Sequence, residues 1–86
     1  MNLTFSTNAW DDYLYWQKTD KTVLKRINSL IKDIQRSPFE GLGKPEALKH
    51  GLSGYWSRRI TDEHRIVYKV AEDNVLIAQL RYHYVD

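Results

Sequence analysis

The sequence predicts an α+β domain in which two N-terminal helices pack on one face of a small antiparallel β-sheet. Three observations support this prediction. Apolar residues recur with helical spacing before residue 38, and with a period of two after residue 54. All four glycines and both prolines fall between these regions, in residues 38–54, which marks one connector. A chain of 86 residues suits one domain, so we expect a single domain over residues 1–86.

The N-terminal region predicts a short strand followed by a first helix. Leu3–Phe5 can form the strand, and Ser6 or Thr7 can cap the helix, because a side-chain oxygen there accepts a free backbone N–H. We expect Asp11 and Asp12 in the first turn, where a carboxylate favours the positive end of the helix dipole. Helical spacing predicts that this helix buries a face made by Trp10, Tyr13, Leu14 and Gln17.

A second helix is predicted directly after the first. Asp20 is its expected N-cap, and Ser37 precedes a proline and so favours extended backbone, which ends the helix near Arg36. Between these limits the apolar residues form one stripe, made by Val23, Leu24, Ile27, Leu30, Ile31 and Ile34.

Three strands are predicted after the connector, at Tyr55–Ile60, Arg65–Val70 and Val75–Tyr84. These runs are rich in β-branched and aromatic residues, and short polar segments separate them, as in a meander of hairpins. In the last run we expect side chains to alternate between the two faces without interruption through His83.

Composition excludes several kinds of site. The net charge is only +2, too small for a protein that coats nucleic acid through charge alone. There is no cysteine, which excludes disulfides, thiolate metal sites and cysteine nucleophiles. The three histidines lie far apart in the sequence, so we expect no metal site, and no glycine loop for a cofactor phosphate is present. No apolar run approaches the length of a membrane span, and we expect no membrane association.

The sheet face away from the helices is the candidate for a functional site. Strand alternation places Arg65 on one face, and the adjacent Arg58 and Arg59 point to opposite faces, so one of them shares the face of Arg65. Alternation alone favours the plainer interpretation of solvated surface arginines. A carboxylate, several cations and a histidine are nevertheless the groups that metal-free RNA cleavage needs as base, charge stabiliser and acid.

Five segments together resemble one protein family. They are Trp10–Tyr13, Gly43–Glu46, Leu52–Ile60, Glu63–Tyr68 and Arg81–Tyr84. The sequence resembles the YoeB (Txe) toxins of the RelE/ParE superfamily of toxin–antitoxin systems, over essentially the whole chain and without an insertion. The resemblance implies the RelE-like fold, similar to that of microbial RNases.

The resemblance implies a bacterial cytoplasmic, ribosome-dependent endoribonuclease that cuts mRNA and needs no metal or cofactor. At the matched positions Glu46 would be the general base, His83 the general acid and Arg65 the group that stabilises the transition-state phosphate. Three more matched residues would bind the RNA: Lys49, Arg59 and Tyr84.

The resemblance also implies partners. These are the 70S ribosome with its mRNA and a YefM-like (Phd-type) antitoxin, with operator DNA contacted only through the antitoxin complex. A homodimer is a further possible assembly, and Trp10, Trp16 and Trp56 are expected to be core or dimer-contact residues. The sequence departs from the family at Ala47, where many relatives carry a second proline, and at the Val85–Asp86 extension.

Two other functions stay open from the sequence. A ParE-like inhibitor that binds DNA gyrase would share the superfamily resemblance but would not need the set Glu46, Arg65 and His83. A catalytically inactive interaction module would need no reacting groups.

Overall fold

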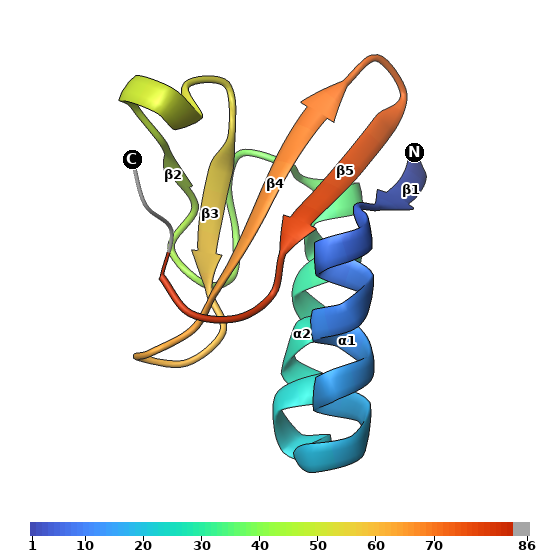
Figure 1. Ribbon diagram of the computed structural model, residues 1–86. Coiled ribbons are helices and arrows are strands. Elements are labelled where there is room, and N and C mark those ends of the chain that lie inside the picture. The colour runs from blue at the N-terminus through green and yellow to red at the C-terminus, as the bar shows by residue number, and fades with distance from the viewer. Residues whose placement is uncertain (84–86) are drawn as a thin grey trace.

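The computed structural model describes residues 1–83 and places two antiparallel helices on one side of a five-stranded sheet (Figure 1). The strand order is β1-β5-β4-β3-β2, and the predicted α+β fold is confirmed. Within residues 1–83, neither helix has the length and apolar character that a membrane crossing requires. The elements are β1 (Asn2–Phe5), α1 (Thr7–Thr19), α2 (Lys21–Arg36), β2 (Glu46–Ala47), the 3-10 turn η1 (His50–Leu52), β3 (Trp56–Arg59), β4 (Arg65–Ala71) and β5 (Asn74–Gln79).

Both helices begin at the predicted caps. The Ser6 hydroxyl accepts a hydrogen bond from the Ala9 N–H at 3.0 Å, and the Asp20 carboxylate accepts from two N–H groups in the first turn of α2. The end of α2 at Arg36 also agrees with the prediction. The placement of Asp11 and Asp12 in the first turn of α1 is wrong, because the helix begins at Thr7 and its first turn holds no acidic residue.

The apolar stripe of α2 lies in the core as predicted, but α1 buries a different face from the one expected. Its buried residues are Ala9, Asp12 and Trp16, whereas Trp10 is 48% exposed. Hydrogen bonds explain the difference: Asp12 accepts from the Leu80 N–H at 3.0 Å, and the Trp16 indole donates to the Leu80 carbonyl at 2.9 Å. Burial raises the pKa of Asp12, although the Leu80 N–H opposes this effect.

The predicted meander of three antiparallel strands is present, and a strand is added at each edge. At one edge β1 pairs in parallel with β5, with Leu3 opposite Val75, so the sheet is mixed rather than purely antiparallel. At the other edge β2 pairs with β3, with Glu46 opposite Ser57. Because glycines and prolines surround β2, the sequence predicted an irregular connector here and no strand.

The last predicted strand is wrong at its C-terminal end, because β5 stops at Gln79. Tyr68 pairs with Ile77 and Val67 pairs with Gln79, so Ala78 is an extra residue in β5. This β-bulge breaks the expected alternation and moves Gln79 to the face opposite that of Ile77. Residues 80–83 therefore follow the strand as an irregular segment.

The guanidinium of Arg58 is fully buried and joins β3 to α2 and the connector. It forms an ion pair with Asp33 and contacts Tyr68 on β4. Burial raises the pKa of Tyr68, whose hydroxyl donates to the carbonyl of Pro38 at 2.6 Å. Arg58 also donates to three carbonyls, those of Ser37 at the C-cap of α2 and of Glu40 and Leu42 in the connector. Of the two adjacent arginines, Arg58 is thus structural.

Replacing Arg58 by methionine should destabilise the fold by about 3–5 kcal/mol, because removing one partner of a buried pair leaves the other charge uncompensated. Arg36→Ala removes the exposed partner of the same carboxylate and should cost no more than about 1 kcal/mol. Urea unfolding of both variants measures the difference. Equal losses would contradict the role assigned to Arg58.

Stability should also depend on Asp33 at acidic pH. The Leu42 N–H, with the guanidinium groups of Arg58 and Arg36, lowers the pKa of Asp33 from 3.8 to about 2. The ionised carboxylate therefore stabilises the fold above pH 4, and this contribution is lost as the pH falls from about 4 to about 2. In urea unfolding, wild type should have a larger free energy of unfolding than Asp33→Asn at pH 4. This difference should become smaller as the pH falls to about 2. A constant difference would contradict the prediction.

Candidate active site

A pocket of about 380 Å³ lies on the sheet face away from the helices. It is lined by Lys44, Pro45, Glu46, Ser57, Arg59, Arg65 and His83. Glu46, Arg65 and His83, the three predicted catalytic residues, thus meet in one cavity together with Arg59. Two further lining residues, Ser57 and Lys44, had no predicted role in the site. Ser57 lies two residues before Arg59 on β3, so strand alternation places both side chains on the same face.

Strand register explains why these side chains share a face. Arg59 lies opposite Arg65 across β3 and β4, and Ser57 lies opposite Glu46 across β3 and β2. Directly opposed residues project to the same side of a sheet. The intervening Arg58 projects to the helical side, which agrees with its complete burial.

A close backbone contact brings Glu46 to this edge. The Arg59 N–H donates to the Gly43 carbonyl at 2.7 Å, and Gly43 has a φ of +80°. A Cβ atom at residue 43 would lie 3.0 Å from both the Arg59 carbonyl oxygen and the Leu30 side chain, so any other residue here would be both crowded and strained in its backbone. The chain can then turn through Lys44 into β2.

The guanidinium of Arg65 is held on one side only. Its Nη1 donates to the carbonyls of Thr61, Asp62 and His64, at 2.7, 3.0 and 3.1 Å. Among residues 1–83, no acceptor is bound to its Nε or Nη2. A guanidinium fixed in this way can offer its remaining N–H groups to a phosphate in the pocket.

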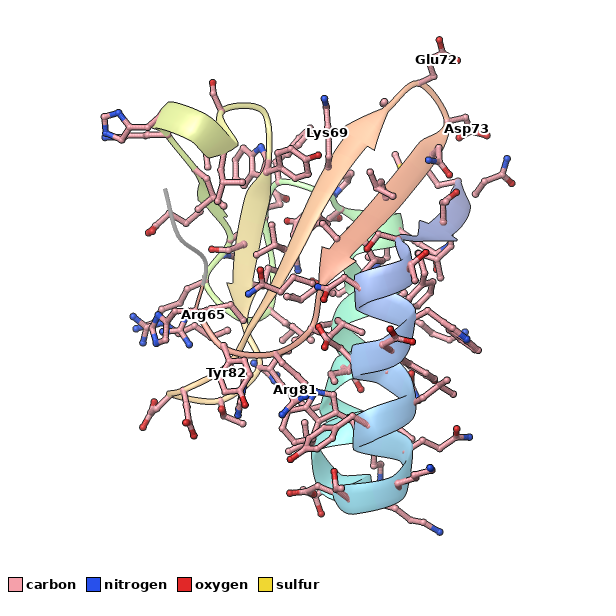
Figure 2. All side chains as sticks on the ribbon, viewed as in Figure 1. Arg65, Lys69, Glu72, Asp73, Arg81 and Tyr82 are labelled. Atoms are coloured by element: carbon pink, nitrogen blue, oxygen red, sulfur yellow. The ribbon has the colours of Figure 1, made fainter. Side chains whose placement is uncertain are left out.

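His83 reaches the pocket through the segment that follows β5. The Gln79 side-chain amide donates to the carbonyls of Arg81, Tyr82 and His83, at 2.7, 3.3 and 3.1 Å. The bulge at Ala78 places Gln79 on the correct face for these bonds. Figure 2 shows Arg81 and Tyr82 on this segment, with Arg65 nearby at the start of β4.

Of the predicted substrate-binding residues, one lies outside this pocket and another lies outside the described part of the chain. Lys49 is exposed just before η1 and does not line the cavity. Tyr84 lies beyond residues 1–83. The guanidinium of Arg81 lies 3.6 Å from the ring centre of Tyr15 and donates to the Tyr82 hydroxyl, so it has structural contacts.

Comparison with known proteins decides the family. The family model described as a YoeB-like toxin of a bacterial type II toxin–antitoxin system matches residues 5–84. The chain belongs to the YoeB toxin family. The toxin YoeB of Escherichia coli K12 is 67% identical over 84 residues, covering 98% of this chain and all of that one. The toxin YoeB of Streptomyces coelicolor is 58% identical over the same share of both chains.

Solved YoeB structures agree closely with the fold. The YoeB/ParE toxin from Agrobacterium tumefaciens is 50% identical, with a TM-score of 0.95 over 98% of this chain and all of the other. The YoeB dimer from Staphylococcus aureus is 52% identical, with a TM-score of 0.91 over 98% of both chains. The predicted resemblance to YoeB toxins is thereby confirmed, and the chain is a toxin of a type II toxin–antitoxin system.

Proposed function

We propose that this YoeB-family toxin is a metal-independent endoribonuclease that cuts mRNA held in the ribosome and so stops translation. The observation that supports the proposal most directly is the convergence of Glu46, Arg65 and His83 in one polar pocket. These three groups supply the base, the charge stabiliser and the acid that cleavage by the RNA 2′-hydroxyl requires.

The reaction exchanges one phosphorus–oxygen bond for another. Glu46 accepts the proton of the ribose 2′-hydroxyl, and the 2′-oxygen attacks the adjacent phosphorus. The bond from phosphorus to the 5′-oxygen breaks, and His83 donates a proton to that leaving oxygen. The products are a 2′,3′-cyclic phosphate and a 5′-hydroxyl end. Arg65 stabilises the negative charge that develops on the phosphate oxygens.

Further cations hold the RNA backbone. Arg59 and Lys44 line the pocket, and Lys49 follows β2 by two residues on the exposed surface. The role of Tyr84 in orienting the RNA beside His83 is proposed from the family resemblance alone.

The ribosome is proposed to supply the orientation that the toxin lacks. A carboxylate is a weak base towards a ribose hydroxyl, and general acid–base catalysis contributes only about 10²–10⁴-fold. Placing the 2′-oxygen in line with the phosphorus can contribute far more. A net charge of +2 binds free RNA weakly at physiological salt, so a ribosome that grips and bends the codon provides both binding and alignment.

Replacing His83 by asparagine should lower the rate of mRNA cleavage in translating extracts by about 10²–10⁴-fold, because the leaving oxygen loses its acid. The 5′ ends of the mRNA are mapped by primer extension, with naked mRNA assayed in parallel and expected to stay intact.

His50→Asn is the matched control, since His50 is exposed on η1, does not line the pocket and has a φ of 57° that asparagine tolerates. Growth arrest with intact mRNA and broken DNA would instead favour the gyrase inhibitor. Equal cleavage by wild type and His83→Asn would contradict the role of His83 as the acid. Cleavage of naked mRNA as fast as that of ribosome-bound mRNA would contradict the ribosome requirement.

We also propose that the toxin binds a YefM-type antitoxin. The YoeB–YefM complex from Staphylococcus aureus is heterotetrameric, and its toxin is 52% identical to this chain with a TM-score of 0.90. The antitoxin would cover the pocket, and operator DNA would be contacted only through this complex. A homodimer of the free toxin is proposed from the Staphylococcus aureus dimer, with the half-exposed Trp10 as a contact residue.

The antitoxin gene is expected beside the toxin gene. Purified antitoxin added at equimolar amounts should abolish mRNA cleavage and co-elute with the toxin in size-exclusion chromatography. Separate elution with undiminished cleavage would contradict the partnership.

A further inference from the structure

The segment after β5 contains a residue in a strained backbone conformation. Tyr82 has a φ of +61°, in the left-handed region. This conformation costs a residue with a side chain about 1–2 kcal/mol. Such strain persists only where the surrounding structure holds the backbone firmly. The groups that hold Tyr82 therefore fix the direction in which the next residue, His83, leaves it.

Two adjacent residues, His64 and Arg65, bond the two backbone groups of Tyr82, whose carbonyl also accepts from the Gln79 amide at 3.3 Å. The Tyr82 N–H donates to Nδ1 of His64 at 2.7 Å, and the Arg65 N–H donates to the Tyr82 carbonyl at 3.1 Å. The second bond is a backbone contact that any residue at position 65 would make. The first depends on one side chain, that of His64.

The ring of His64 is itself fixed by its surroundings. Its side chain is 13% exposed and packs edge-on against Trp16 of α1, with ring centres 4.9 Å apart. Because Nδ1 accepts a hydrogen bond, the ring proton lies on Nε2, which faces the Glu63 carboxylate at 3.6 Å. The ring of Tyr82 is tilted by 50° against that of His64, with ring centres 5.4 Å apart. Nδ1 is thereby directed at Tyr82.

We propose that His64 is a positioning residue for the general acid. Its Nδ1 holds the Tyr82 N–H and so fixes the turn that delivers His83 into the pocket with Glu46 and Arg65. His64 does not line that pocket and acts only through Tyr82. The proposal rests on the proposed function, in which His83 protonates the leaving oxygen. A displacement of the acid by about 1 Å can reduce the rate about 10²-fold.

Three substitutions separate hydrogen bonding from packing. Asparagine places an acceptor oxygen close to the position of Nδ1, whereas glutamine places its amide nearer to the position of Nε2. Leucine fills the space beside Trp16 but accepts no hydrogen bond. If His64 only packed, His64→Leu would be tolerated best. If it positions His83 through Nδ1, His64→Asn should be the best tolerated of the three.

The first measurement needs no RNA. Amide hydrogen exchange of Tyr82, followed by NMR in the free toxin, should match wild type in His64→Asn and be about tenfold faster in His64→Leu and His64→Gln. Thermal melting establishes that each variant is folded at the temperature used. Unchanged Tyr82 exchange in His64→Leu would overturn the proposal.

The second measurement is mRNA cleavage on programmed ribosomes. His64→Asn should stay within a few-fold of wild type, while His64→Leu and His64→Gln should lose about 10²-fold in kcat with little change in KM. Leucine performing as well as asparagine would overturn the positioning role. If wild type cuts no mRNA, the proposed function fails, and the exchange of the Tyr82 amide still decides whether His64 holds this turn.

Discussion

The buried ion pair between Arg58 and Asp33 is the interaction on which the rest of the structure depends. A guanidinium without solvent exposure is tolerated only if its N–H groups find acceptors, and here they bind a carboxylate, a phenol and three carbonyls. These acceptors come from α2, β4 and the connector. The same contacts that satisfy one charge therefore fix the connector, and the connector delivers Glu46 to the pocket.

The pocket is assembled from three separate segments, each held by a different kind of contact. Glu46 is held by the pairing of β2 with β3, and Arg65 is held by carbonyls of the 61–64 turn. The segment that carries His83 is held by the side chains of Gln79 and His64. Within residues 1–83 these contacts leave the Nε and Nη2 groups of Arg65 without an acceptor. A small domain can thus keep its proposed reacting groups accessible on one face while its stability comes from the other face.

The helices and the central strands were predictable from the sequence because apolar periodicity and capping residues act locally. Apart from the placement of Asp11 and Asp12 in the first turn of α1, the errors arose from contacts between residues far apart in the sequence. The buried face of α1 was missed because hydrogen bonds to Leu80 bury Asp12 and Trp16. The end of β5 was missed because a bulge leaves no mark in an alternating pattern. Family resemblance supplied Glu46, Arg65 and His83, whereas the only signal for Ser57 was that it shares the strand parity of Arg59.

The parallel pairing of β1 with β5 has a consequence for how the protein is made. β1 pairs with β5 far along the chain, with Asn2 opposite Asn74, so this edge of the sheet forms only after β5 has been synthesised. The segment that carries His83 follows β5 directly. A nascent chain therefore cannot complete the pocket until residues 74–83 have left the ribosome that makes it, so the proposed action on translation can begin only after this segment has folded.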